Sequence, residues 1–195
     1  MATPVGDPQK RIEFGQMANV SKSETQLKMI QAVCHLMDQG VSVGEISGIA
    51  VTEYCSVDKM YVNRYFGDLP DLLMETIQYL LTEEMPSMLS SDVFPVIGTF
   101  SVNPHIEKAF KLATYLSGQE AFADRLSQLG KVVSEVYAKQ LQDNFGLLPS
   151  EALSEAKFGI MFIAGYLSFG GALNLGQKEM QDFFDRRLEG LKKQD

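Results

Sequence analysis

The sequence of 195 residues predicts an all-α protein with a small N-terminal helical bundle and a larger C-terminal one. Apolar residues recur at the three- and four-residue spacing of amphipathic helices along most of the chain. Glycines and capping residues separate these segments, and no alternating strand pattern exceeds four residues. Apolar residues make up 45% of the chain and charged residues 22%, which are ordinary values for a globular protein. A chain of this length needs no disulfide or metal ion to stabilise its core.

Four helices are expected in the N-terminal part, each delimited by a capping residue or a glycine. They lie between Ser23 and Gly40, between Val43 and Tyr54, over residues 59–65, and over residues 69–85. The apolar stripe expected on the second helix comprises Ile46, Ile49, Ala50 and Tyr54. Ser42 and Glu45 form a candidate capping box for that helix, and Asp58 is a candidate cap for the third. Gly67 ends the third helix, and Asp68 caps the fourth.

The C-terminal part follows a loop-like stretch, residues 86–104, that is rich in serine and turn-forming residues. Asn103 and Pro104 make a good helix start, because a proline in the first turn loses no hydrogen bond. Four further helices are expected over residues 104–117, 119–145, 150–173 and 177–192. Gly118, Gly146 and Gly176 lie at their ends, and Ser150 is the expected cap of the third.

Two segments of the sequence indicate where in the cell the protein is expected to lie. Residues 1–16 carry no apolar run of signal-peptide length, so we interpret residues 1–20 as a flexible arm of a cytoplasmic protein. Residues 158–177 carry no charge and are long enough to span a bilayer. Their glycines, serine and asparagine instead favour a helix covered by protein, so we expect no membrane partner. A membrane-associated protein anchored through this stretch is the alternative.

The chain offers no constellation for catalysis or metal binding. His35 and His105 lie far apart and lack Cys, Asp or Glu at zinc-ligand spacing. Neither Cys34 nor Cys55 has the context of a nucleophile, and two cysteines exclude a disulfide-rich scaffold. No phosphate loop or dinucleotide fingerprint is present. We therefore expect neither an enzyme nor a cofactor.

The clearest functional signal lies around residues 55–68. A helix, a three-residue turn and a short second helix follow one another, as in a helix-turn-helix whose second helix enters the DNA major groove. Val62 and Phe66 share the inner face of the short helix. Lysine can bind guanine or phosphate, asparagine can bind adenine, and tyrosine can donate to phosphate. The candidate DNA-binding residues are Lys59, Met60, Tyr61 and Asn63, which would face bases, Lys28, Ser47 and Tyr65, which would hold phosphates, and Arg64.

Residues 23–81 resemble the N-terminal DNA-binding domain of the TetR (tetracycline-repressor-like) transcriptional regulators. The resemblance rests on Val57-Asp58-Lys59, Arg64-Tyr65-Phe66-Gly67 and Asp71-Leu72-Leu73 at the family's spacing, and on Ala32, Leu36 and Gly40 in the first helix. The rest of the chain resembles the family only in helix count and length. The resemblance implies a homodimeric regulator, expected to be a repressor. Its two helix-turn-helix domains, one from each subunit and called heads below, would bind one palindromic double-stranded DNA operator. A small molecule bound in the C-terminal bundle would release both heads from the operator.

The same resemblance implies the domain organisation. Residues 1–20 would be a flexible arm, residues 21–68 a helix-turn-helix DNA-binding domain, and residues 69–195 a helical ligand-binding and dimerisation domain. The long helix over residues 69–85 would link the last two. Where the family's turn carries glycine, this chain has Ser56. We therefore expect a residue with a Cβ at positive φ, at a cost of about 1 kcal/mol.

The charge balance limits how DNA can be bound. Acidic residues outnumber basic ones by 25 to 17 in the whole chain, for a net charge of −8, and by eight to six over residues 1–70. This excludes an indiscriminate polyanion binder, so DNA contacts must come from a local patch. The alternative is a ligand-binding or adaptor protein with a degenerate helix-turn-helix that does not bind DNA specifically.

The C-terminal part holds most of the aromatic residues, which either line a cavity for a small lipophilic effector or pack as an ordinary core. The candidate ligand-binding residues are Met88, Phe110, Tyr115, Phe122, Tyr137, Phe158, Phe162 and Tyr166. The candidate dimer interface combines small residues that allow close helix approach with apolar ones. It comprises Gly159, Ile160, Ile163, Ala164, Leu167, Phe183, Phe184 and Leu188. The alternative for this second set is burial within one chain.

Overall fold

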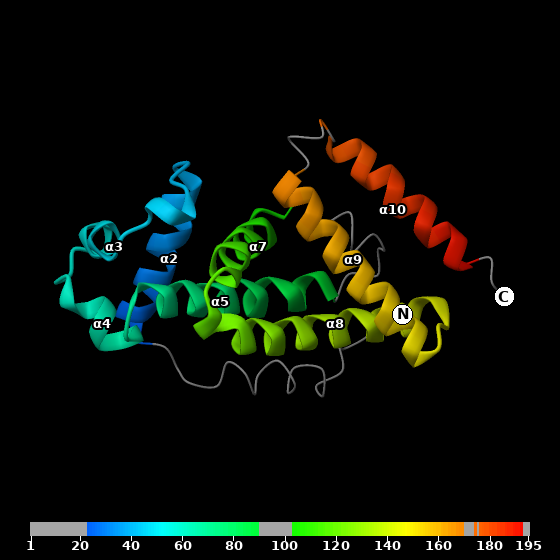
Figure 1. Cartoon of the computed structure of the whole chain (residues 1–195), viewed down its shortest axis with the longest axis horizontal. Coiled ribbons are helices and arrows are strands. Elements are labelled where there is room, and N and C mark those ends of the chain that lie inside the picture. Colours follow the sequence, from blue (N-terminus) through cyan, green and yellow to red (C-terminus); the bar gives the residue numbers. More distant parts are fainter. Residues whose placement is uncertain (1–22, 90–102, 170–173, 175, 193–195) are drawn as a thin grey trace, which may run out of the picture. The chain divides into compact units, whose positions relative to one another are not determined.

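The computed structural model describes residues 23–89, 103–169, 174 and 176–192 (Figure 1). All regular structure in these residues is helical, which confirms the all-α class. Within the same ranges, no helix combines the length and the hydropathy that crossing a bilayer requires. The chain divides into two compact units, residues 1–91 and residues 92–195, which are described separately below.

The first unit is built on helix α2. It contains α2 (Glu24–Asp38), the 3-10 turn η1 (Val43–Glu45), α3 (Gly48–Cys55), α4 (Met60–Phe66) and α5 (Leu69–Leu89). Helix α2 begins as predicted, because the Ser23 hydroxyl accepts from the Gln26 N–H at 3.3 Å while the Gln26 side chain accepts from the Ser23 N–H at 2.9 Å. Met29, Ile30 and Val33 are completely buried, so one face of α2 forms the centre of this unit.

The region predicted as a single second helix is divided in two. Ser42 and Glu45 form the expected capping box, but it encloses only the turn η1. The chain is extended at Ile46, whose side chain is buried, and the helix α3 starts only afterwards. Its cap is Ser47, whose Oγ accepts from the Ala50 N–H at 3.1 Å. The interruption lets the chain bury Ile46, and it changes which side chains of α3 face the core.

This change of register makes the predicted apolar stripe wrong in part. Ile46 is buried as expected, whereas Ile49 and Tyr54 are exposed. The buried residues of α3 are instead Val51 and Thr52. The stripe was predicted for one continuous helix. Because the helix is broken after its first turn and begins again at Ser47, different side chains share the buried face.

Helix α5 belongs to the first unit, although we predicted it as the linking helix of the C-terminal domain. It packs against α2 and α4. The side chains that it buries include Leu72, Leu73, Met74, Ile77 and Leu80. Its start is as predicted, since Asp68 Oδ1 accepts from the Asp71 N–H at 2.8 Å. Its end is not, because the helix continues through Pro86 to Leu89, where we expected a loop. Residues 90–102 of that expected loop lie outside the described residues.

The second unit contains α7 (Pro104–Ser117), the 3-10 turn η2 (Glu120–Phe122), α8 (Ala123–Phe145), α9 (Pro149–Phe169) and α10 (Gln177–Lys192). Helix α7 has the predicted bounds, and its cap Asn103 accepts from the His105 N–H at 2.8 Å. Helix α10 also has the predicted bounds. The helix predicted over residues 119–145 is split into η2 and α8, and residues 170–173 of the next one lie outside the described part. Ser150 is not its cap, because α9 already begins at Pro149.

Helix α9 is the centre of the second unit. Helix α8 packs along it, and α7 contacts both (Figure 1). Helix α10 is attached to α9 mainly through phenylalanines. The Phe162 ring stacks on Phe183 at 4.3 Å between centroids and meets the edge of Phe184 at 5.2 Å. Phe184 is 1% exposed and Met180 is 2% exposed, so both residues anchor α10 to the core of this unit.

Candidate functional site

The turn between α3 and α4 is a left-handed helix end. Ser56 has φ 54° and ψ 43°, the conformation predicted for it from the sequence. The Val57 N–H donates to the Thr52 carbonyl at 3.0 Å, and the Ser56 N–H donates to the Glu53 carbonyl at 3.1 Å. These two bonds form a Schellman motif, which satisfies carbonyls at the end of α3 and fixes the direction in which the chain leaves it.

Helix α4 is held at both ends and on its inner face. At its start Asp58 Oδ1 accepts from the Met60 N–H at 2.8 Å, which confirms Asp58 as the cap. At its end Gly67 adopts φ 95°. On the inner face Val62 is 2% exposed, and a Cβ built on Gly48 of α3 would lie 3.8 Å from Val62 Cγ2. The two helices therefore approach closely where Val62 packs, and the opposite face of α4 is directed outward.

The outward residues of α4 are mostly those that we predicted to meet DNA. Lys59, Met60, Asn63 and Arg64 are exposed, and Met60 has 71% of its surface accessible. Tyr61 and Tyr65 are half-buried, with ring centroids 5.6 Å apart. The Arg64 guanidinium lies 5.8 Å from the centroid of each ring, within the range of cation–π attraction. The guanidinium of Arg64 therefore lies beside both rings while its side chain stays exposed.

The two predicted phosphate contacts outside α4 lie on other helices of the first unit. Lys28 is exposed on α2, where its Nζ is 2.6 Å from Glu24 Oε1. The hydrogen bond and charge of Glu24 raise the pKa of Lys28, and those of Lys28 lower the pKa of Glu24. Ser47 is exposed at the start of α3, but its Oγ is already engaged as the helix cap. Both residues are accessible, and both have a protein partner.

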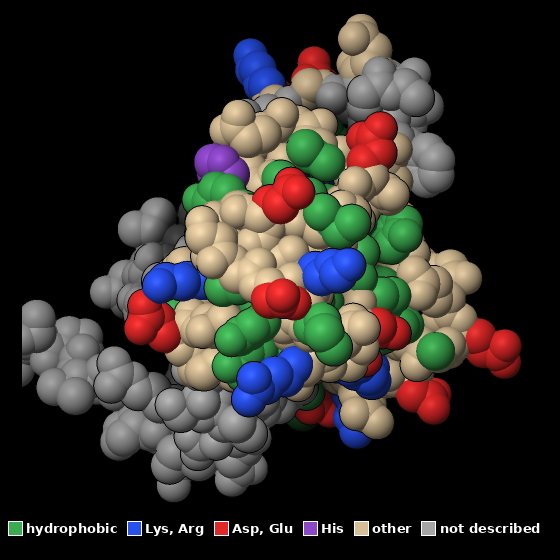
Figure 2. Space-filling model, turned by 90° about the vertical axis from the view of Figure 1, so that its left-hand side faces the viewer, with side chains coloured by type: hydrophobic (Ala, Val, Ile, Leu, Met, Phe, Trp, Pro, Cys, Tyr) green, Lys and Arg blue, Asp and Glu red, His purple; other side chains and the backbone are tan. Residues whose placement is uncertain are grey.

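The surface around α3 and α4 is poor in positive charge. Within the described residues 23–82, three are Lys or Arg and eight are Asp or Glu. Figure 2 looks onto the side where α3 and α4 lie, and shows hydrophobic side chains interspersed with isolated charges of both signs. The sequence-based prediction missed two exposed apolar residues on this unit, Ile49 and Tyr54, the latter stacked on His35 at 4.5 Å between ring centroids. The signal that could have found them is Ser47, a second capping residue that restarts the helix.

The predicted ligand-binding residues differ widely in exposure. Phe122 and Tyr137 are buried, Phe110, Phe162 and Tyr166 are half-buried, Tyr115 and Phe158 are exposed, and the side chain of Met88 lies outside the described residues. Burial raises the pKa of the Tyr137 phenol, with a smaller contribution from the carboxylate of Glu155. Residues with such different environments include core side chains as well as surface ones.

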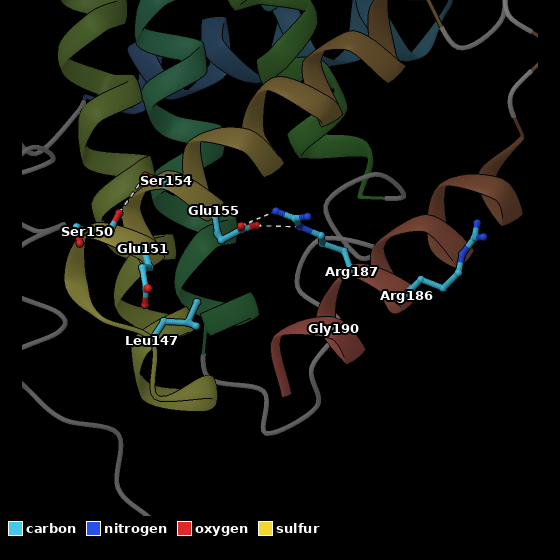
Figure 3. A pocket seen from close by; sticks show the side chains of 8 residues that line it. All are labelled: Leu147, Ser150, Glu151, Ser154, Glu155, Arg186, Arg187 and Gly190. Carbon is cyan, nitrogen blue, oxygen red and sulfur yellow. Dashed lines mark hydrogen bonds and ion pairs between the residues drawn. The ribbon is translucent and has the colours of Figure 1, made fainter. Parts of the chain in front are cut away.

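A cavity of about 550 Å³ lies elsewhere in the second unit, between the start of α9 and the end of α10 (Figure 3). It is lined by Leu147, Ser150, Glu151, Ser154, Glu155, Arg186, Arg187 and Gly190, none of which we predicted. Arg187 points across it to Glu155, with its Nε 3.1 Å from Oε2 and its Nη2 2.5 Å from Oε1 (Figure 3). The same guanidinium lies 5.4 Å from the Phe158 ring. Arg187 therefore connects α10 to α9, and this polar lining differs from the apolar one expected for a lipophilic ligand.

The predicted dimer-interface residues divide by burial. Gly159, Ile163 and Phe184 are buried within the chain itself, Ile160, Ala164, Leu167 and Phe183 are half-buried, and the side chain of Leu188 lies outside the described residues. Ile163 and Phe184 thus pack within one chain, which was the alternative for this set. Met161 of α9, 70% exposed, is an apolar residue of this region that we did not predict.

Comparison of the chain with protein-family models, with curated proteins and with solved structures found no match. In the part of the chain that the structure describes, no group of three or more His, Cys, Asp or Glu is placed to hold a metal ion. The function is therefore inferred from the residues and their geometry.

Proposed function

We propose that the chain is a TetR-like transcriptional regulator, acting as a repressor, whose α3–turn–α4 segment is a helix-turn-helix. The observation that carries this proposal is the arrangement of α4. Its inner residue Val62 packs against α3, while Lys59, Met60, Asn63 and Arg64 face solvent from a short helix that is fixed at both ends. A recognition helix needs this combination, because base contacts require side chains that project from a rigidly placed backbone.

The exposed side chains of α4 have the chemistry to read bases. The Asn63 amide can make two hydrogen bonds to adenine, and Lys59 can bind guanine or a phosphate. Tyr65 and Lys28 would contact phosphates, as would the start of α3 near Ser47. Few cations are available in one head, so its affinity for the DNA backbone is modest and falls with salt. A homodimer with two heads on a palindromic operator compensates, because the second head binds at a high effective concentration.

The second unit would supply the dimer interface and the effector site. Partly exposed apolar residues of α9, among them Ile160, Leu167 and Met161, are available for a partner subunit. A small lipophilic effector would release the operator by changing the distance between the two heads, since half-sites recur about 34 Å apart. An acyl or aromatic compound that stabilises the protein should weaken operator binding and change the head spacing. A compound that saturates the protein and changes neither would refute this mechanism.

DNA binding is tested with the full-length chain and a pool of randomised duplexes. Enriched sequences should contain an inverted repeat, and fluorescence anisotropy gives their affinities at a stated salt concentration. Lys59→Ala and Asn63→Ala should each weaken binding at least about fivefold, in line with about 1–3 kcal/mol for a base contact. Lys131→Ala is the matched control, because it removes the same charge from a side chain that is 75% exposed on α8. Absence of enrichment, or an equal loss in the control, would contradict the proposal.

A second function is favoured by the charge balance of the first unit. Eight acidic residues against three basic ones over the described residues 23–82, together with the exposed Ile49 and Tyr54, suit a ligand-binding or adaptor protein whose helix-turn-helix has lost specific DNA binding. The duplex selection separates the two functions, since an adaptor would enrich no inverted repeat.

A further inference from the structure

Met60 is the most exposed of the large apolar side chains in the described residues, at 71%. The backbone of Met60 is held in place, because its N–H donates to the carboxylate of Asp58. A methionine side chain is flexible and polarizable, and it gains most where it meets another small apolar group. The one apolar group that the major groove displays is the C5 methyl of thymine.

The immediate surroundings of Met60 favour a base edge over the DNA backbone. The Asp58 carboxylate beside it would repel a phosphate, whereas a thymine methyl carries no charge. Two cations flank Met60: exposed Lys59 directly before it, and Arg64 one turn later, beside the Tyr61 and Tyr65 rings. Met60 itself is the uncharged, apolar contact that the first turn of α4 offers.

Asn63 follows Met60 by three residues, so the two side chains are neighbours on one face of the helix, with Cβ atoms about 5–6 Å apart. Both are exposed, and the Asn63 side-chain amide makes no hydrogen bond within the described part of the chain. An asparagine amide pairs with the N6 and N7 atoms of adenine. Successive base pairs are about 3.4 Å apart, so two neighbouring side chains reach neighbouring pairs.

We infer that each half-site of the operator contains two adjacent A·T pairs, one with a thymine whose methyl packs on Met60 and one with an adenine bound by Asn63. This inference rests on the DNA-binding function proposed above and specifies what that site recognises. Met60 would thus contribute to sequence recognition through an apolar contact with a base, which a cation or a phosphate contact cannot provide.

The test replaces thymine by deoxyuridine, which removes only the methyl group. Duplexes from the enriched operator carry this replacement at one thymine position at a time, made in both half-sites. One position should weaken binding about fourfold per half-site, which corresponds to roughly 0.8 kcal/mol for one buried methyl group. In Met60→Ala the difference between thymine and deoxyuridine at that position should disappear. Leu148→Ala, which also shortens an exposed large apolar side chain, 64% exposed between α8 and α9, should keep the difference.

The contact between Asn63 and adenine is tested by a second base replacement. Replacing the neighbouring adenine by 7-deazaadenine removes the N7 acceptor and should weaken binding to the wild-type protein but not further weaken binding to Asn63→Ala. If duplexes are enriched but no deoxyuridine position matters, or if its effect persists in Met60→Ala, the inference is refuted while DNA binding stands. If no duplex is enriched, the proposed function itself fails and the inference falls with it.

Discussion

Replacing Ser56 by glycine should stabilise the first unit. Ser56 has φ 54°, where a Cβ costs roughly 1–2 kcal/mol because it approaches the following carbonyl. Glycine removes that cost but gains entropy in the unfolded chain, which offsets about 0.4–1 kcal/mol. The exposed Ser56 side chain makes no hydrogen bond within the described residues that the change would break. The difference between these values is about 0–1.6 kcal/mol, with a central value of about 0.8 kcal/mol of net stabilisation.

Two measurements on the full-length chain check this value. A domain of this size gains about 4–8 °C in Tm per kcal/mol, so calorimetry should show a rise of a few degrees in the transition of the first unit. The N–H of Val57 donates to the Thr52 carbonyl across the turn. Its hydrogen exchange should slow by the factor that corresponds to the same gain in free energy of unfolding. Ser56→Ala is the control, since it keeps the Cβ and should bring no gain. If alanine stabilises as much as glycine, or if glycine destabilises, backbone strain at this turn is refuted.

Three further outcomes follow from the structure. Gly67→Ala should destabilise by about 1–2 kcal/mol in urea titration, because φ is 95° and the new Cβ would lie 3.2 Å from Asp71 Oδ2. Phe184→Ala should cost about 3–5 kcal/mol and lower the calorimetric transition of the second unit, since it removes a buried ring that meets Phe162 between α9 and α10. The Ser42 hydroxyl and N–H lower the pKa of Glu45, so this carboxylate stabilises the fold above its ordinary pKa and loses that effect as the pH falls through the lowered value. Ser42→Ala should raise the pKa of Glu45 in an NMR titration.

The helix boundaries that the sequence predicted correctly are those set by local chemistry. Ser23, Asn103 and Asp68 each accept a hydrogen bond from a backbone N–H two or three residues later, which depends on a few consecutive residues. Gly67 and Ser56 end helices at positive φ for the same local reason. For these positions no knowledge of the rest of the fold is needed.

The boundaries that were wrong depend on packing or on competing local signals. Ser42 and Glu45 start a helix by every local criterion, yet the structure breaks it to bury Ile46 and starts again at Ser47. Pro86 is a strong signal for a helix end, yet α5 continues for three residues beyond it. At Ser42 the neighbouring sequence supports two outcomes, and the burial of Ile46 selects one of them.

The candidate sites also divide into one that local sequence predicts and others that depend on packing. The outward face of α4 was predictable, because Val62 and Phe66, four residues apart, mark the inner face of a short helix. The effector site was not, because an aromatic side chain such as Tyr137 looks alike in sequence whether it fills a core or lines a cavity. The cavity beside Arg187 and Glu155 depends on where α10 meets α9, which no local pattern encodes.

The pair of tyrosines on α4 gives the protein an intrinsic optical probe. The chain has no tryptophan, so its near-ultraviolet emission comes from seven tyrosines, two of which, Tyr61 and Tyr65, flank Arg64 on this helix. A duplex seated against α4 would change the surroundings of both phenols at once. Unlabelled protein would therefore report occupancy of this face through its own fluorescence, and Tyr61→Phe together with Tyr65→Phe would silence that signal.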